Sequence, residues 1–219
     1  YQLPEGFHLV SFMPREDPRD ALVSNSYDSI DDLPLGAIVG TSSLRRKSQL
    51  LHYRDDLVIR DLRGNVQTRL SKLDNGDYDA IVLASAGLMR LNLHERISQY
   101  IPVEISLPAV GQGIVVIESL EADKNLYGEI IKLNNTDSYI AAMAERAFNQ
   151  ELKGGCHVAI AAYATITDEV LNLEAMVSSS DGKIIIRRSM VGEVSQPSAL
   201  GKKLAEKFVE LGAYDVLEK

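Results

Sequence analysis

Apolar and polar residues along the middle of the chain alternate in short blocks. Three apolar runs predict buried strands, and each is followed by residues with helical spacing. The predicted strand and helix pairs are 37–40 with 42–53, 57–60 with 65–73, and 80–84 with a helical turn through 88–91. This alternation across short connections predicts a mainly parallel sheet covered by helices, an α/β fold. Because ligands bind beyond the carboxyl ends of such strands, the residues after each strand are site candidates.

The last third of the chain has a different pattern. A helix is predicted first, then three strands, then an amphipathic helix, at 138–152, 159–165, 170–177, 183–190 and 197–211. Asp181-Gly182 is a hairpin turn signal between the last two strands. This order predicts a small α+β C-terminal domain with an antiparallel sheet. Two proline-containing segments, 14–20 and 107–113, suit crossings between domains. A further strand is predicted before the first segment, at 7–12, and another after the second, at 114–118, followed by a short helix at 126–133.

Composition narrows the range of functions. The chain has 219 residues and a formal net charge of −8, which argues against a general nucleic-acid or membrane-surface binder. One cysteine excludes an intramolecular disulfide, and the four histidines have no metal-ligand spacing. No apolar run is as long as a membrane span, so we expect a cytoplasmic protein with no membrane partner and no metal.

The end of the first strand carries the strongest candidate site. Thr41 and Ser43 are good N-cap residues, and the first turn of a helix offers unpaired backbone N–H groups. Arg45 and Arg46 add positive charge beside these groups. Together they predict a site for an acidic ligand.

The next two strand ends carry similar residues. Arg63 and Gly64 follow the second strand, with Arg69 on the helix beyond, while Ala84 ends the third strand and Arg90 follows it. Guanidinium groups gathered at one sheet edge would bind a ligand with several acidic groups. Ordinary surface arginine is the alternative, and Arg90 is the weakest candidate.

The only cysteine, Cys156, follows two glycines. The residues alone favour a small buried side chain. A nucleophilic or covalently modified thiol is the alternative, because Gly154 and Gly155 permit close backbone approach.

These motifs occur in one order along the chain. They are Glu16 to Ala21, Gly40 to Arg46, Leu62 to Val66 with Thr68 to Leu70, Leu107 to Gly113, and Gly154 to Cys156. The ordered set resembles the hydroxymethylbilane synthase family, also called porphobilinogen deaminase, over essentially the whole chain.

The resemblance implies a fold, a reaction and a cofactor. The family is a three-domain cytoplasmic transferase of heme and tetrapyrrole biosynthesis, with two domains like type II periplasmic binding proteins. It condenses four porphobilinogen molecules with loss of ammonia onto a dipyrromethane cofactor, joined by a thioether to the cysteine that matches Cys156. The resemblance therefore reverses the interpretation of this thiol. By resemblance the cofactor and the growing anionic pyrrole chain contact Thr41, Ser43, Arg45, Arg46, Arg63, Gly64, Arg69, Ala84 and Gln112, with Arg90 as a further substrate contact.

The chain also departs from the family pattern. The family's catalytic aspartate lies upstream of Tyr1, so the catalytic residue is unknown here and we expect the chain alone to be inactive. The implied units are 1–13 with 114–131 as a remnant of domain one, 19–107 as domain two and 136–219 as domain three. The family is expected to be monomeric, but an apolar strand at 114–117 would expose an edge, which predicts disorder, aggregation or self-association.

Two other functions remain open from the residues. The first is a non-catalytic anion-binding module of periplasmic-binding-protein type. The second is a fragment that shares the family without its activity. Cys156 distinguishes the first from the enzyme, since a pure binder has no use for a covalently loaded thiol.

Overall fold

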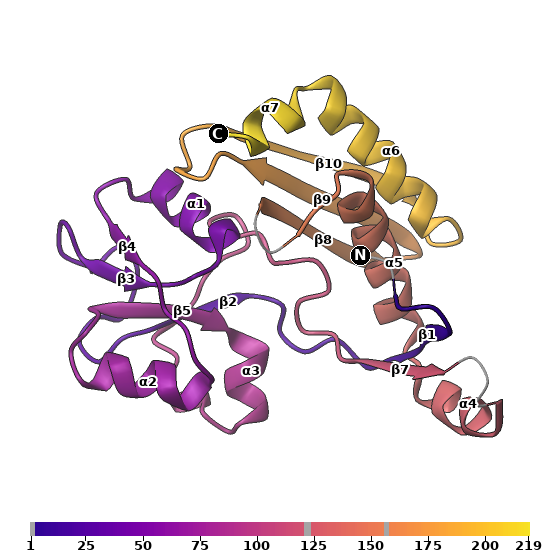
Figure 1. Ribbon diagram of the computed structural model, residues 1–219, viewed down its shortest axis with the longest axis horizontal. Helices are drawn as coiled ribbons and strands as arrows, with labels where there is room; N and C mark the ends of the chain where they lie inside the picture. Colours follow the sequence, from indigo (N-terminus) through magenta and orange to yellow (C-terminus); the bar gives the residue numbers. More distant parts are fainter. Residues whose placement is uncertain (1–2, 121–123, 156–157) are drawn as a thin grey trace.

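A computed structural model describes residues 3–120, 124–155 and 158–219. Figure 1 shows three groups of elements, each built on its own sheet. A five-stranded sheet with three helices forms one body, and a three-stranded sheet with two long helices forms another. A two-stranded ladder with a short helix lies below the second body in this view.

The five-stranded sheet has the order β4-β3-β5-β2-β6. Its strands are β2 (Asp20–Val23), β3 (Ile38–Gly40), β4 (Val58–Arg60), β5 (Ala80–Ala84) and β6 (Gln99–Tyr100). β3 is parallel to β4 and β5, as the alternating pattern predicts. β2 is antiparallel to both β5 and β6, so the sheet is mixed. The α/β fold class is confirmed.

Helices cover this sheet on both faces. They are α1 (Leu44–Tyr53), α2 (Val66–Asp74) and α3 (Ser85–Arg90), with a short 3-10 turn at His94–Arg96. Ser43 and Asn65 cap the first two helices, because their side chains accept hydrogen bonds from Arg46 N and Thr68 N. Each face of the sheet has its own hydrophobic core beneath the helices. Successive strand residues point into opposite cores, as Val82 and Leu83 of β5 do.

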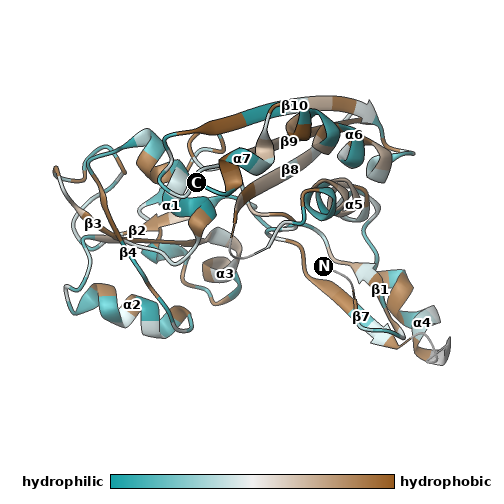
Figure 2. Cartoon of the chain, turned by 45° about the horizontal axis from the view of Figure 1, so that its top comes forward, coloured by the Kyte–Doolittle hydropathy of each residue, from teal (hydrophilic) through white to brown (hydrophobic). Residues whose placement is uncertain are grey.

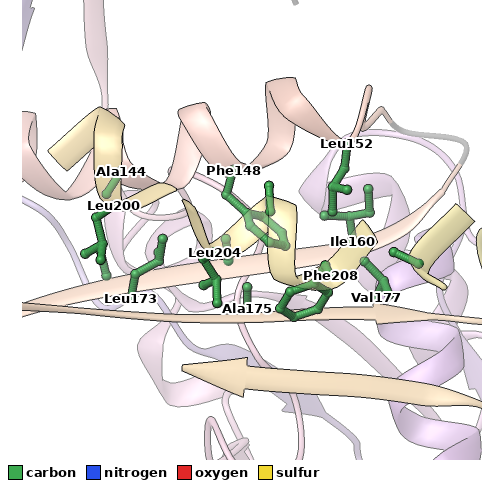
Figure 3. Close-up of a cluster of buried hydrophobic side chains, with 14 of the residues drawn as sticks. Ala144, Phe148, Leu152, Ile160, Leu173, Ala175, Val177, Leu200, Leu204 and Phe208 are labelled. Atoms are coloured by element: carbon green, nitrogen blue, oxygen red, sulfur yellow. The ribbon is translucent and has the colours of Figure 1, made fainter. Parts of the chain in front are cut away.

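The C-terminal body is an antiparallel sheet with helices on one face. Its elements are α5 (Thr136–Glu151), β8 (Ala159–Thr167), β9 (Val170–Ser178), β10 (Ile185–Glu193), α6 (Pro197–Glu210) and α7 (Ala213–Leu217). Figure 2 shows α5 and α6 against the sheet, and Figure 3 shows the side chains between them. Phe148 and Phe208 meet edge to face, with ring centroids 5.0 Å apart. This core fixes α5 firmly on β8.

A small antiparallel ladder joins β1 (Phe7–Phe12) to β7 (Val116–Leu120). The helix α4 (Lys124–Ile130) and a 3-10 turn (Ile131–Leu133) follow it. The ladder is tied to the C-terminal body, because Asn135 N donates to Phe12 O at 2.8 Å. The strand predicted at 114–118 is β7, which begins two residues later, at Val116, and pairs with β1 of the same chain.

The two large bodies also touch directly. His52 Nδ1, near the end of α1, lies 3.1 Å from Gly182 O in the loop between β9 and β10. Gly182 has φ +74°, and a Cβ there would lie 2.2 Å from Ser48 O, so only glycine permits this approach. Arg187 on β10 donates to the backbone oxygens of Val103 and Glu104. These contacts set α1 beside the C-terminal sheet.

Candidate functional site

A cavity of about 540 Å³ lies between the start of α1 and helix α5. Both large bodies contribute to its wall. The residues that line it are Thr41, Ser42, Ser43, Leu44, Arg45, Arg46, Arg69, Ala109, Val110, Arg146, Asn149, Gln150, Gly155, Val158 and Ile160. Five predicted site residues therefore meet in one place: Thr41, Ser43, Arg45, Arg46 and Arg69.

The first wall is the turn that joins β3 to α1. Thr41 is 4% exposed, its N–H donates to Arg60 O at 2.9 Å, and its Oγ1 accepts from Ser43 N at 3.2 Å. Gly40 is the last residue of the strand, and a Cβ there would lie 2.9 Å from the Tyr78 ring, so this close packing favours glycine. The turn thus aims the first turn of α1 at the cavity.

Arg45 and Arg46 are held by a buried carboxylate, that of Asp20. Arg45 Nη1 and Nη2 donate to the two oxygens of Asp20 at 2.8 and 3.1 Å, and Arg46 Nε donates to Oδ1 at 2.9 Å. Ser106 Oγ and Gln112 Nε2 donate to the same carboxylate. Asp20 is 0% exposed, and burial alone would raise its pKa, but the charges of the two arginines lower the pKa well below its ordinary value. Asp20 therefore stays ionised and cancels one of the two positive charges.

A second buried carboxylate, Glu145 on α5, holds the two crossing segments. Arg15 Nη1 donates to it from the first crossing at 2.5 Å, and Gly111 N donates from the second at 2.6 Å. Ala164 N on β8 donates as well, at 2.8 Å. Burial raises the pKa of Glu145 above its ordinary value in spite of these donors. The crossings are thus pinned to the C-terminal body.

Five other predicted residues lie outside the cavity lining. Arg63 has an 81% exposed side chain, 3.7 Å from Asp61, and its neighbour Gly64 has φ +123°. Ala84 pairs with Asp20 across the sheet. Arg90 is exposed and donates to Gly113 O at 2.8 Å. Gln112 donates through Nε2 to Asp20 and accepts through Oε1 from Arg45. Their roles as ligand contacts stay predictions.

The predicted attachment residue, Cys156, lies outside the described residues. Gly155, directly before it, lines the cavity. Gly154 packs against Asn149 so closely that a Cβ would lie 1.9 Å from Asn149 Oδ1. The last described residue before the cysteine is therefore at the cavity wall.

Sequence reasoning missed two important residues. Asp20 lies in a polar segment interpreted as a crossing, and Arg146 lies on a helix interpreted only through its apolar face. The spacing of Arg146, Asn149 and Gln150, which puts them on one helix face, is a signal that could have found the second wall.

Two kinds of feature, a metal-binding cluster and a membrane-spanning helix, are absent from the described residues, 3–120, 124–155 and 158–219. In these ranges no group of three or more metal-ligating side chains is present. No helix within them is long and apolar enough to span a membrane.

Comparison with known proteins decides the family. A family model described as the dipyrromethane cofactor binding domain of porphobilinogen deaminase matches residues 1–128, and one for the C-terminal domain of porphobilinogen deaminase matches residues 139–210. A porphobilinogen deaminase of Francisella philomiragia is 71% identical over 219 residues, which is 100% of this chain and 72% of the relative. The chain belongs to the porphobilinogen deaminase family. This membership confirms the predicted family, its transferase class and its dipyrromethane cofactor domain.

A second porphobilinogen deaminase and one solved structure are also similar to this chain. A porphobilinogen deaminase of Francisella tularensis subsp. novicida is 72% identical over 218 residues and is covered over 72% of its length. Among solved structures, a nutrient binding protein from Burkholderia cenocepacia bound to methionine has a TM-score of 0.40 at 15% identity, over 68% of each chain.

Proposed function

We propose that this member of the porphobilinogen deaminase family binds a dipyrromethane cofactor in the cavity between α1 and α5 and joins it through a thioether to Cys156. The reaction of this family is the condensation of four porphobilinogen molecules with loss of ammonia, followed by release of hydroxymethylbilane. The part of it proposed for the described residues is to hold the cofactor and the growing pyrrole chain. One observation supports the proposal most strongly: four arginines line the cavity together with Gly155, the residue directly before the only cysteine.

The donor set fits the cofactor. Each pyrrole ring carries an acetate and a propionate, so two rings bring four carboxylates. Guanidinium, hydroxyl and amide groups in the wall are donors suited to carboxylates. Apolar side chains such as Leu44, Val110 and Ile160 supply surface for the flat rings. The bound cofactor supplies a nucleophilic pyrrole carbon from which the chain grows.

The described residues supply binding and orientation. The α1 turn offers Thr41 and Ser43 hydroxyls with two clamped arginines, and Asp20 fixes the angle of both guanidinium groups. Because Asp20 is ionised and hydrogen-bonded on both oxygens, it is not a proton donor. Positive charge in the cavity holds the growing anionic chain as each ring is added.

The covalent step is tested with a dipyrromethane that carries a hydroxymethyl group. The Cys156 sulfur forms a bond to that carbon while the carbon–oxygen bond breaks, and the thiol proton leaves in the water released. We expect the intact mass of the chain to show one adduct, which peptide mapping places on Cys156. The adduct should be absent in Cys156→Ser, and an excess of unreactive dipyrromethane tetracarboxylate should suppress it. No adduct, or adducts spread over lysines, would contradict the proposal.

We also propose the division into units 1–13 with 114–131, 19–107 and 136–219. The three sheets support it, since each belongs to one unit. The cytoplasm is the proposed compartment, because a reducing environment keeps a functional thiol free.

The ladder supports weak self-association of this chain. Its side chains include exposed apolar groups, among them Phe7 at 38% and Leu120 at 50%, and the outer edge of each strand lacks a strand partner within the described residues. Sedimentation velocity over a concentration series tests this, and a single monomer boundary throughout would count against it.

A further inference from the structure

A second cavity, of about 350 Å³, lies further along α1, between that helix and the C-terminal sheet. Figure 1 shows α1 beside the loop that joins β9 to β10, where His52 Nδ1 lies 3.1 Å from Gly182 O. Both large bodies contribute to the wall of this cavity, and none of its lining residues also lines the first cavity. It is therefore a separate place at which the two bodies meet.

Part of the wall of the second cavity is apolar. Ile105 lines it from the segment after β6, Met176 from β9 and Ile185 from β10. Met176 is fully buried in a small core with Leu107, and Ile185 packs against that core. Gln49 also lines the cavity, and its amide is fixed because Nε2 donates to Leu107 O and Oε1 accepts from Leu107 N. The wall is thus held in place by packing and hydrogen bonds, as in a preformed ligand site.

Two opposite charges beside this apolar wall are not compensated by ion pairs. Glu104 and Arg188 are exposed and line the cavity, and neither forms an ion pair with any residue in the ranges that the structure describes. Arg188 Nη1 donates to Arg187 O at 2.7 Å, which uses a single N–H of the guanidinium. Arg187 is committed instead, because it donates to Glu174 at 2.7 Å and to the backbone oxygens of Val103 and Glu104.

The two charges come from different bodies. Glu104 belongs to the segment after β6, and Arg188 belongs to β10. A molecule that satisfies both of them needs an ammonium group for the carboxylate, a carboxylate for the guanidinium, and an apolar chain between the two ends. Such contacts are charge-assisted hydrogen bonds, and the chain would lie against Ile105 and Ile185.

We propose that the second cavity binds a small ω-amino acid, a straight aliphatic chain with an ammonium at one end and a carboxylate at the other, which joins the two bodies through Glu104 and Arg188. Because both charges are exposed, solvent screens them, and the dissociation constant is on the order of 10⁻³ M. This site does not depend on the binding of dipyrromethane in the first cavity.

The second cavity is also connected to the first. Gln49 bonds to Leu107, and the same Leu107 O accepts from Arg45 Nη1 at 2.7 Å. A ligand beside Gln49 therefore restrains the segment that orients Arg45. Since it binds the folded chain and contacts both bodies, it raises the temperature of thermal unfolding.

The first test is a titration of the 219-residue chain with γ-aminobutyrate, ε-aminocaproate and ω-aminocaprylate, followed by NMR of labelled methionine and isoleucine methyl groups. We expect at least one of these amino acids to shift the methyl signals of Ile105, Met176 and Ile185 with saturation, and raised salt to weaken its binding. The alkanoate and the alkylamine of the same chain length, which each lack one charge, should bind about tenfold more weakly or not at all. The proposal is overturned if none of the three amino acids shifts these signals.

The second test exchanges the charges. Arg188→Glu leaves two carboxylates, so this variant should lose the amino acid and bind the diamine of the same length. Glu104→Arg leaves two guanidinium groups and should bind the dicarboxylate instead. The double variant should regain part of the affinity for the amino acid, because this ligand can bind end for end.

The matched controls are Arg60→Glu and Glu118→Arg, which change exposed residues outside the second cavity and should bind the amino acid like the parent chain. Equal urea midpoints will show that all variants keep the fold. If Arg188→Glu and Glu104→Arg keep the parent's affinity for the amino acid and gain none for the diamine and the dicarboxylate, the ligand binds elsewhere and the proposal is wrong.

Discussion

Asp20 and Glu145 are both fully buried carboxylates paired with arginine, yet their pKa values shift in opposite directions. Asp20 has two guanidinium partners and two neutral side-chain donors. Glu145 has one guanidinium and two backbone N–H groups. Burial penalises both anions, so the second positive charge decides which way the balance falls.

The difference matches the place of each group. Asp20 lies behind the cavity wall, where its permanent charge fixes two arginines and leaves their pair one net positive charge. Glu145 lies where the two crossings meet the C-terminal body, and there it joins three segments through neutral and charged donors alike. One carboxylate therefore sets the electrostatics of the site, and the other sets the attachment of the bodies around it.

The largest expected effect is that of Asp20→Asn. It leaves Arg45 and Arg46 close together with no counterion, and we expect a loss of about 3–5 kcal/mol in the free energy of unfolding. Urea unfolding followed by circular dichroism measures this. Asp61→Asn is the control, since the Asp61 side chain is 75% exposed and its removal should change stability by less than about 0.5 kcal/mol. Equal effects of the two substitutions would refute the assigned role of Asp20.

Glu145→Gln should cost less, about 1–3 kcal/mol. The Arg15 side chain is 13% exposed, so it can gain some hydration when its counterion is removed. The N–H of the new glutamine amide, however, would face N–H donors that now bind a carboxylate oxygen of Glu145. The same unfolding assay applies, with Glu151→Gln, exposed on the same helix, as the control. A loss as large as that of Asp20→Asn would erase the contrast between the two sites.

Acid should separate the two groups by sign. The folded-state pKa of Asp20 is lowered, so its stabilising contribution is present above its ordinary value of 3.8 and is lost as the pH falls further. The folded-state pKa of Glu145 is raised, so its contribution improves as the pH falls from that raised value toward 4.5. Each slope is at most about 1.4 kcal/mol per pH unit. Free energies of unfolding are measured from pH 3 to 7 for the parent chain and both variants. Glu145→Gln should lack the gain in stability that the parent chain shows as the pH falls toward 4.5, and Asp20→Asn should lack the loss that the parent chain shows below pH 3.8. If both variants keep the pH dependence of the parent chain, the directions of the two pKa shifts are contradicted.

The smallest effect concerns a single supporting hydroxyl. Ser106 Oγ donates to Asp20 at 2.7 Å, and Ser106→Ala should lower the free energy of unfolding by about 1 kcal/mol. Because the two arginines remain, the acid profile should keep its shape. Thermal unfolding at neutral pH checks the loss, and a change near that of Asp20→Asn would mean that the hydroxyl, rather than the charges, dominates.

Sequence patterns predicted most elements because apolar periodicity reports burial. β1 and β5 were predicted with the bounds that the structure shows, and α2 within one residue. The direction of β2 could not be predicted, because a short apolar run has the same pattern whichever way it pairs. The late start of β7 follows from the crossing before it, where Met13 N pairs with Val115 O outside the ladder.

The site was harder to predict because its buried face is polar. The buried residues of α1 are Arg45, Ser48, Gln49 and Leu50, and three of these look solvent-exposed to any hydrophobicity pattern. Their partners, such as Leu107 O for Gln49 Nε2, come from distant segments. N-cap chemistry and clustered arginines located the cavity wall, but tertiary contacts alone reveal which charges are compensated.

Binding of a free dipyrromethane tetracarboxylate to the 219-residue chain, compared with binding of its tetramethyl ester, tests the central claim most directly. The cavity's positive charge predicts that the acid binds at a single site, that raised salt weakens this binding, and that the ester binds far more weakly. Equal affinity for acid and ester, or acid binding that does not respond to salt, would contradict the account.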